Sequence, residues 1–219
     1  LAPVFGEGEH PLCFLANRAH HAEIGGVSPG SMPAGTSYLS QEGVVIAPCL
    51  LFEAGESKLD QLDKVLRTAH HPSRQPEDNL ADLSAQVASL RKGIEGVNEL
   101  LKSHGEDTLA RQMDALREES STSCTDYLEQ MGTCEFSSQQ SLDDGDELAL
   151  RVIVKKGRAT LDFRGTAPTR KDNLNATEAI VTSAVCYCLR LLIGKDLPLN
   201  EGLLEPVDLI IPEGSLLHP

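Results

Sequence analysis

Residues 78–105 read DNLADLSAQVASLRKGIEGVNELLKSHG and hold the most regular apolar pattern in the chain. Apolar residues recur there in steps of three and four, at Leu80, Leu83, Val87, Leu90, Ile94, Val97 and Leu101. That spacing predicts one face of an α-helix, which Asp78 or Asn79 can cap at its start. Gly93 and Gly96 inside this helix each cost about 1 kcal/mol relative to alanine, which predicts close packing against a neighbouring element.

The segments around this helix favour further helices and several strands. Helices are expected at 56–68, 107–131 and 176–193. Strands are expected at 44–46, 50–52, 148–154, 159–163 and 209–211, with a hairpin turn at 155–157. Helices and strands come in blocks, so the expected fold class is α+β, with mixed strands and hairpins packed against several helices. The expected divisions are a strand and loop region at 1–55, a helical region at 56–131, and a hairpin, helix and strand region at 140–219.

Composition excludes several function classes. The formal net charge of −14 argues against nucleic acid, whose binding favours Lys and Arg. No run of 18 apolar residues occurs, so no membrane span is expected. The six cysteines are scattered and form no C-x-x-C pair, which indicates a reducing, cytoplasmic setting. The chain lacks an initiator Met and stops after an apolar run, so we expect a piece of a longer protein.

A metal-binding or catalytic site is most strongly indicated in the stretch 18–26, which reads RAHHAEIGG. Imidazole and carboxylate are the ligands expected for Zn, Mn or Fe. His20 and Glu23 would share a face on a helical turn, whereas His21 and Glu23 would share a face in an extended segment. A third ligand must come from elsewhere, and Glu42 is the nearest candidate. An ordinary His–Glu hydrogen bond in a surface loop is the alternative explanation.

These motifs together resemble the hydantoinase B/oxoprolinase family. The motifs that carry the resemblance are RAHHAEIGG (18–26), PGSMP (29–33), QEG (41–43), DNLADLSAQ (78–86) and DFRGTAP (162–168). Three later motifs resemble the family's oxoprolinase members: NLNA (173–176), YCLR (187–190) and DLPLN (196–200). They occur in the family's order along the whole chain, so we expect the chain to be part of a larger hydantoinase B-type domain.

The resemblance implies an ATP-dependent cyclic amide hydrolase that opens the lactam 5-oxoproline to glutamate. An actin-like hydantoinase A-type half would bind ATP-Mg, and the B half would carry a divalent metal (Mn, Zn or Fe) and the ring-opening chemistry. That A half would lie in the same polypeptide or in a separate subunit, and the enzyme is expected to be a homo-oligomer. Relatives open hydantoins or caprolactam or carboxylate ketones, so family membership does not determine the substrate.

The resemblance also implies roles for individual residues. His20, Glu23 and Glu42 are the expected metal ligands, with Glu42 as an alternative base. His21 is the expected proton carrier or else a packed neighbour of His20, and Arg18 would hold the substrate carboxylate. Glu23 departs from the family, which usually has Asp there. A non-catalytic segment that supplies an interface to the A half is the alternative function.

Overall fold

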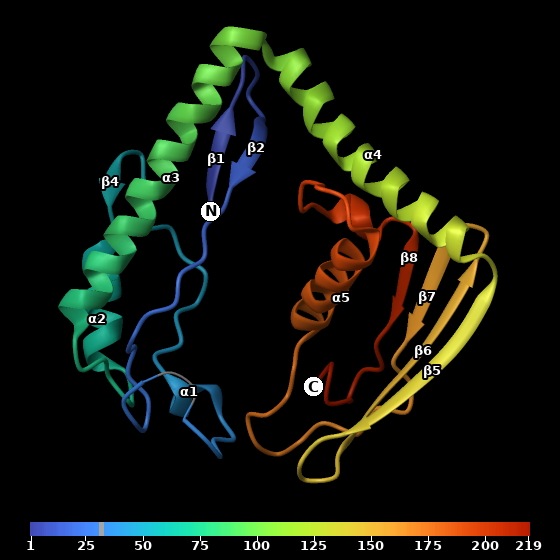
Figure 1. Cartoon of the computed structure of the whole chain (residues 1–219). Helices are drawn as coiled ribbons and strands as arrows, with labels where there is room; N and C mark the ends of the chain where they lie inside the picture. The colour runs from blue at the N-terminus through green and yellow to red at the C-terminus, as the bar shows by residue number, and fades with distance from the viewer. Residues whose placement is uncertain (31–32) are drawn as a thin grey trace. The chain divides into compact units, whose positions relative to one another are not determined.

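The computed structural model describes residues 1–30 and 33–219, and the chain divides into two compact units, Leu1–Leu109 and Ala110–Pro219. Helices and strands occur in blocks along the chain, which confirms the predicted α+β class (Figure 1). Helix α4, Glu106–Met131, begins at the end of the first unit and continues into the second. The expected helical region 56–131 therefore crosses the boundary between these units, and the expected division of the chain stays a prediction.

The first unit contains two small hairpins, two longer helices, one short helix and a long loop region. Strands β1 (Ala2–Phe5) and β2 (Pro11–Leu15) pair antiparallel and pack against helix α3 (Pro76–His104). Helix α2 (Leu59–Thr68) packs beside α3 and buries Leu62 and Leu66. The remaining elements are helix α1 (Leu39–Glu42) and the short hairpin of β3 (Phe52–Glu53) and β4 (Glu56–Ser57).

Helix α3 begins earlier than its apolar pattern predicted. Its first residue is Pro76, which suits the first turn because proline lacks the N–H that would go unpaired there. Asn79 therefore lies inside the helix, and the prediction that it or Asp78 caps the helix is wrong. The close packing predicted at Gly93 is confirmed, since a Cβ there would lie 2.9 Å from a Leu15 methyl carbon. At Gly96 a Cβ would meet no described atom within 4 Å.

The strand expected at 44–46 is absent from the described residues, and this prediction is wrong. Only Val44 is buried, and its N–H donates to the Ile24 carbonyl oxygen over 2.8 Å. Val45 is exposed and Ile46 is half-buried, so the run alternates, but no strand among the described residues pairs with it. At 50–52 only Phe52 joins a strand. Val44 belongs to a loop that hydrogen-bonds to segment 24–27.

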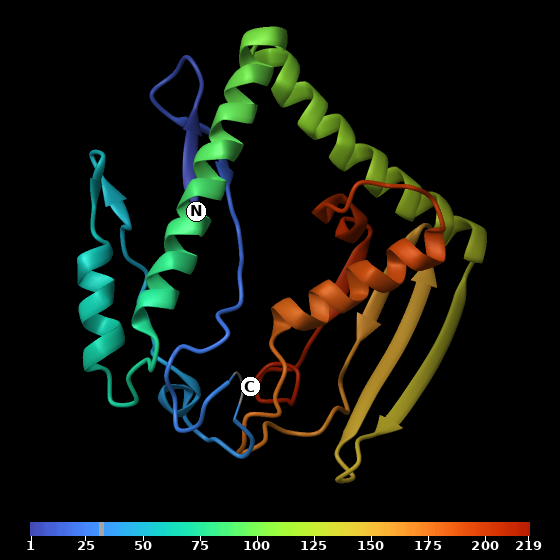
Figure 2. The ribbon, with the colours of Figure 1, turned by 60° about the vertical axis from the view of Figure 1, so that its left-hand side comes forward.

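The second unit is built on a four-stranded sheet (Figure 2). Strands β5 (Cys134–Ser141), β6 (Glu147–Lys155) and β7 (Arg158–Asp162) form an antiparallel meander. Lys156 and Gly157 both have positive φ, as the tight turn predicted between β6 and β7 requires. Strand β8 (Val207–Ile210) pairs parallel to β7, and a parallel pair needs a crossover connection. Helix α5 (Glu178–Ile193) lies in that connection, followed by the short 3-10 helix η1 (Glu201–Leu204).

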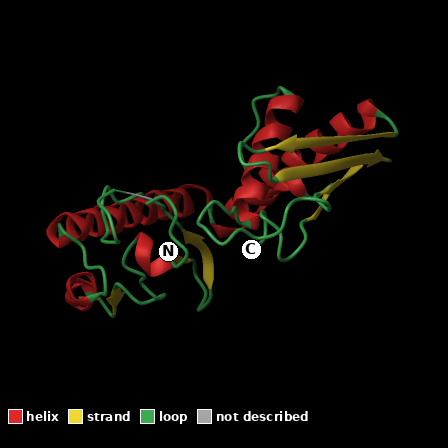
Figure 3. Ribbon diagram, turned by 90° about the horizontal axis from the view of Figure 1, so that it is seen from below, coloured by secondary structure: helices red, strands yellow, loops and turns green. Residues whose placement is uncertain are grey.

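One face of this sheet carries the core of the second unit. Val152 and Val154 of β6 are buried, Ile153 between them is half-buried, and Arg151 and Lys155 on either side are exposed, which is the pattern of a sheet covered on one face. Helix α5 buries a stripe at every fourth residue, consisting of Val181, Val185 and Leu189. Cys124 and Leu128 of α4 and Leu203 of η1 complete the cluster. Figure 3 shows α5 and α4 as helices beside the strands.

The second unit should lose stability when its core is truncated. Leu203 has no exposed surface, so Leu203→Ala should lower the free energy of unfolding by ~2–5 kcal/mol through lost burial and a residual cavity. Leu199 is 64% exposed in the same region, and Leu199→Ala should change that free energy by less than about 0.5 kcal/mol. Urea denaturation of both variants measures the difference, and equal losses would contradict the described core.

Candidate functional site

The candidate site is a loop cluster in the first unit in which segment 23–26 lies directly against segment 71–74. The Gly26 N–H donates to the His71 carbonyl oxygen over 3.2 Å. Gly25 has a φ of 85°, and a Cβ there would lie 2.3 Å from that same oxygen, so only glycine fits. On its other side segment 24–27 bonds to 41–44, where the Val27 N–H donates to the Gln41 carbonyl oxygen. The motifs at 18–26 and 41–43 therefore meet.

The Glu23 carboxylate binds these segments together. One oxygen accepts from the Gly25 N–H at 2.6 Å and from the Arg74 guanidinium at 2.8 Å. The other accepts from the Ser73 hydroxyl at 3.0 Å and the Arg74 N–H at 3.1 Å. Burial alone would raise the pKa of Glu23, but the hydrogen bonds from Gly25, Arg74 and Ser73 outweigh it and hold this pKa below its ordinary value. Glu23 is thus an ionised anchor.

The side chain of Asn79 secures the same loop from helix α3. It is 2% exposed, and its amide nitrogen donates to the Glu23 carbonyl oxygen over 2.6 Å. Its amide oxygen lies 2.6 Å from the Ser73 hydroxyl, whose single hydrogen is shared between this oxygen and the Glu23 carboxylate. One buried amide therefore fixes both the 21–26 segment and the 71–74 segment relative to the first turn of α3, and it leaves neither of its polar atoms unpaired.

His21 lies next to Asp82, one helical turn beyond Asn79. The His21 Nδ1 atom is 3.1 Å from an Asp82 carboxylate oxygen. The His21 side chain is 13% exposed and the Asp82 side chain 53%. Because these groups belong to the motifs 18–26 and 78–86, the structure joins two motifs that lie about sixty residues apart. An imidazole bound to a carboxylate at one nitrogen can accept or donate a proton at the other.

The other predicted site residues lie apart from this contact. Arg18 and His20 are exposed, and neither has a polar contact with another described residue. Glu42 accepts a hydrogen bond from the buried Thr36 hydroxyl at 3.0 Å. Residues 31 and 32 of the motif 29–33 lie outside the described residues.

The predicted metal ligands do not form a ligand set as they lie here. A carboxylate has about four lone-pair sites, and Glu23 already accepts four hydrogen bonds, so a metal ion would have to displace one of its donors. Within residues 1–30 and 33–219, no group of three or more His, Cys, Asp and Glu side chains is placed to hold a metal ion. The metal-binding roles of His20, Glu23 and Glu42 stay a prediction.

Sequence reasoning missed four residues of this cluster: Ser73, Arg74, Asn79 and Asp82. For two of them a signal was present, since Asn79 and Asp82 lie three apart in the motif 78–86 and so share a helix face. Ser73 and Arg74 lie in a loop without periodicity. Only the fold brings them to Glu23.

In the second unit the motif residues stabilise turns. Asp162 is buried and accepts hydrogen bonds from the backbone N–H and the guanidinium of Arg164, whose side chain holds the pKa of Asp162 at about 2. Asn175 accepts from the Arg170 N–H at 2.9 Å and donates to the Arg170 carbonyl oxygen at 3.1 Å. Both residues thus fix turns. Asp and Asn side chains commonly do so by hydrogen-bonding to nearby backbone groups.

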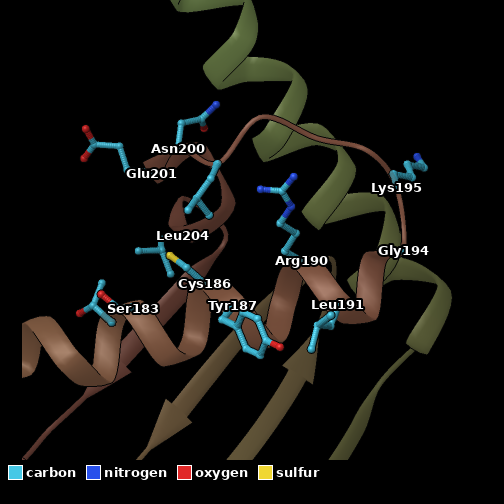
Figure 4. A pocket seen from close by; sticks show the side chains of 12 residues that line it. Ser183, Cys186, Tyr187, Arg190, Leu191, Gly194, Lys195, Asn200, Glu201 and Leu204 are labelled. Atoms are coloured by element: carbon cyan, nitrogen blue, oxygen red, sulfur yellow. The ribbon is translucent and has the colours of Figure 1, made fainter.

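The second unit also contains an open groove of about 680 Å³. Its lining comes from α5, the turn after α5 and η1, and includes Tyr187, Arg190, Leu191, Lys195 and Leu204 (Figure 4). Tyr187 and Leu191 are exposed although they are large and apolar. Because the opposite face of α5 is buried in the core, this helix is apolar on two faces, which is typical of a helix covered on both sides.

Comparison with known proteins places the chain in a family. The model of the family described as hydantoinase B/oxoprolinase matches residues 1–219. The chain belongs to this family. Among its relatives, the 5-oxoprolinase of Saccharomyces cerevisiae is 39% identical and 5-oxoprolinase 1 of Arabidopsis thaliana 34%, each over the whole chain. The chain spans only 18% and 19% of the length of these hydantoinase B/oxoprolinase family members.

Solved structures show the same fold. The ATP-dependent caprolactamase of Pseudomonas jessenii matches 91% of the chain with a TM-score of 0.79 and 22% identity. The nucleotide-free structure of acetone carboxylase matches 99% with a TM-score of 0.75 and 17% identity. The chain covers 35% and 30% of those two chains. None of the helices in the described residues has the length and apolar character that a membrane span requires.

The Glu23 anchor should govern acid stability of the first unit. Its pKa is lowered on folding, so its stabilising contribution is present above the unfolded pKa and is lost as the pH falls through the folded pKa. Glu23→Gln should therefore lower the free energy of unfolding by about 2 kcal/mol at neutral pH and flatten its decline in acid. Denaturation at several pH values measures both effects. The exposed Glu9 is the control, and a Glu9→Gln variant with the same loss would contradict the anchor.

Proposed function

We propose that the chain is part of the B half of an ATP-dependent 5-oxoprolinase, which opens the lactam 5-oxoproline to glutamate while an A half cleaves ATP. The observation that carries this proposal is the 39% identity with a 5-oxoprolinase over the full chain. The cluster around His21 and Glu23 supports it, because residues from two family motifs form a fixed polar site there. The fold shared with an ATP-dependent caprolactamase is in keeping with a cyclic amide as substrate.

The chemistry explains why such a reaction needs ATP. An amide carbon is a poor electrophile, and phosphorylation of the amide oxygen turns that oxygen into part of a leaving group. Water then adds to the carbon, the ring C–N bond breaks, and a second water releases phosphate, so one ATP and two waters yield glutamate, ADP and phosphate. The B half must bind the lactam and move a proton from the attacking water. His21 is the proposed proton carrier, with Arg18 positioned on the exposed segment before it to pair with the substrate carboxylate.

A divalent ion of the Mn, Zn or Fe type would polarise the carbonyl if it binds here. His20, Glu23 and Glu42 remain the proposed ligands, although Glu23 would have to release a hydrogen-bond donor first. Elemental analysis of the purified protein and of His20→Ala tests this proposal. Stoichiometric metal that is lost in the variant supports it, whereas wild-type metal content in His20→Ala refutes it.

Turnover should require both halves. The chain has no P-loop, so it should not hydrolyse 5-oxoproline with ATP by itself. Combined with its A half, the wild type should release glutamate, and His21→Ala should reduce kcat about 10²–10⁴-fold because a positioned proton carrier is lost. His104→Ala at the exposed end of α3 is the control. Substrate screening with hydantoin, caprolactam and acetone distinguishes the related hydrolases and carboxylases, and turnover of one of these alone would refute the 5-oxoprolinase assignment.

A second function of this chain is favoured by the groove beside α5. We propose that the exposed face of α5, comprising Tyr187 and Leu191, contacts the A half. A chain that spans about a fifth of its relatives' length needs contact surfaces to the rest of the enzyme, and α5 is apolar on the face that the second unit leaves uncovered. Arg190 and Lys195 at the groove favour carboxylates on the partner surface.

Binding to the A half should depend on this face. Leu191→Glu should weaken binding at least about tenfold, because it places a charge in an apolar contact. Leu174 is equally exposed but does not line the groove, so Leu174→Glu is the matched control. Isothermal titration with the A half measures both. If the two variants bind alike, the α5 face is not the contact.

A further inference from the structure

The contact between His21 and Asp82 determines which imidazole nitrogen carries the proton. An ionised carboxylate can only accept hydrogen bonds, so the 3.1 Å contact requires a hydrogen on His21 Nδ1. Neutral histidine in solution favours the other tautomer, with its hydrogen on Nε2. Asp82 therefore selects the tautomer in which the Nε2 lone pair is available.

The surroundings of His21 hold the imidazole in place for such a role. Asn79 binds the Glu23 carbonyl oxygen two residues further along, and Arg74 binds the Glu23 carboxylate. The Asn79 amide nitrogen also lies 3.4 Å from His21 Nδ1, so the ring edge that carries Nδ1 faces helix α3. An amide N–H and an Nδ1–H are both donors, so this longer contact is not a hydrogen bond when Nδ1 carries the hydrogen, and the 3.1 Å contact with Asp82 selects the tautomer. Helix α3 and the loop before it thus fix the backbone at His21, and Asp82 orients the ring.

Asp82 contributes little to stability through this contact. Its side chain is half exposed, and ion pairs at exposed positions are worth ~0–1 kcal/mol. His21 is the more buried partner. A half-exposed carboxylate on a largely buried imidazole is more effective in orienting the ring than in holding the fold together.

We propose that His21 and Asp82 form a dyad in which Asp82 is the positioning residue: its carboxylate holds the hydrogen on His21 Nδ1 and leaves the Nε2 lone pair available. The reaction assigned to this dyad rests on the proposed function. As water adds to the activated amide carbon, the new C–O bond forms, the water O–H bond breaks, and His21 Nε2 takes the proton. Asp82 keeps the ring oriented during this transfer. The proton returns to the ring nitrogen of the lactam when the C–N bond breaks.

The tautomer can be measured without any substrate. In the ¹⁵N-labelled 219-residue chain, at an alkaline pH where histidine is neutral, long-range ¹H–¹⁵N spectra should show His21 protonated on Nδ1. His10 is exposed and has no polar contact with another described residue, so it serves as an internal reference that should show the ordinary preference for Nε2. A His21 spectrum identical to that of His10 would overturn the dyad.

Two variants separate positioning from folding. Asp82→Ala should return His21 to the ordinary tautomer while the backbone spectrum stays that of a folded chain. Asp78→Ala removes an exposed carboxylate one turn earlier on the same helix, which has no polar contact with His21 among the described residues, and should leave the tautomer unchanged. If Asp82→Ala keeps the Nδ1 proton, Asp82 is not the positioning residue.

Activity with the A half then gives an independent result. Asp82→Ala should lower kcat about 10²-fold with little change in KM, and Asp82→Glu should restore part of it, since a carboxylate is again within reach. If the tautomer behaves as expected but 5-oxoproline is not turned over by the wild type, the proposed function fails and the dyad stands. If kcat is unchanged in Asp82→Ala while the wild type is active, the dyad's catalytic role is refuted.

Discussion

The candidate site depends on one buried arrangement, in which the Glu23 carboxylate accepts hydrogen bonds from Gly25, Ser73 and Arg74. Segments that lie about fifty residues apart are joined by this group, and neither has regular secondary structure to hold it. Loops without a ladder of backbone hydrogen bonds need such side-chain contacts to become ordered. Asn79 adds a second fixed point from helix α3. His21 is presented by a rigid loop because of these contacts.

This arrangement also gives Glu23 a structural role, at a position where the resemblance to the family implies Asp. The longer side chain reaches both the Arg74 backbone and its guanidinium. A carboxylate engaged in that way is a structural anchor first, and service as a metal ligand competes with it. His21 differs, since its Nδ1 contacts the Asp82 carboxylate. Neighbouring residues of one motif thus divide into an anchor and the residue that we propose as proton carrier.

The family motifs of the second unit have a structural role within that unit. Its family motifs stabilise turns at the edge of the sheet, through Asp162 with Arg164 and Asn175 with Arg170. These pairs are ionic or buried, so their loss would loosen the loops after β7. The exposed face of α5 is the feature of this unit that indicates a binding partner, because the large apolar side chains of Tyr187 and Leu191 are left uncovered.

Sequence alone determined the fold class, the long helices, the β6–β7 hairpin and the family, since periodicity, turn residues and ordered motifs are local signals. It also indicated that chemistry belongs to 18–26. It could not place Arg74 on Glu23 or Asp82 on His21, and it wrongly predicted a strand at 44–46 and a cap at Asn79. Those outcomes depend on which loops meet in three dimensions. Long-range contacts are decided by packing and by the pairing of buried polar groups, and neither leaves a periodic pattern along the chain.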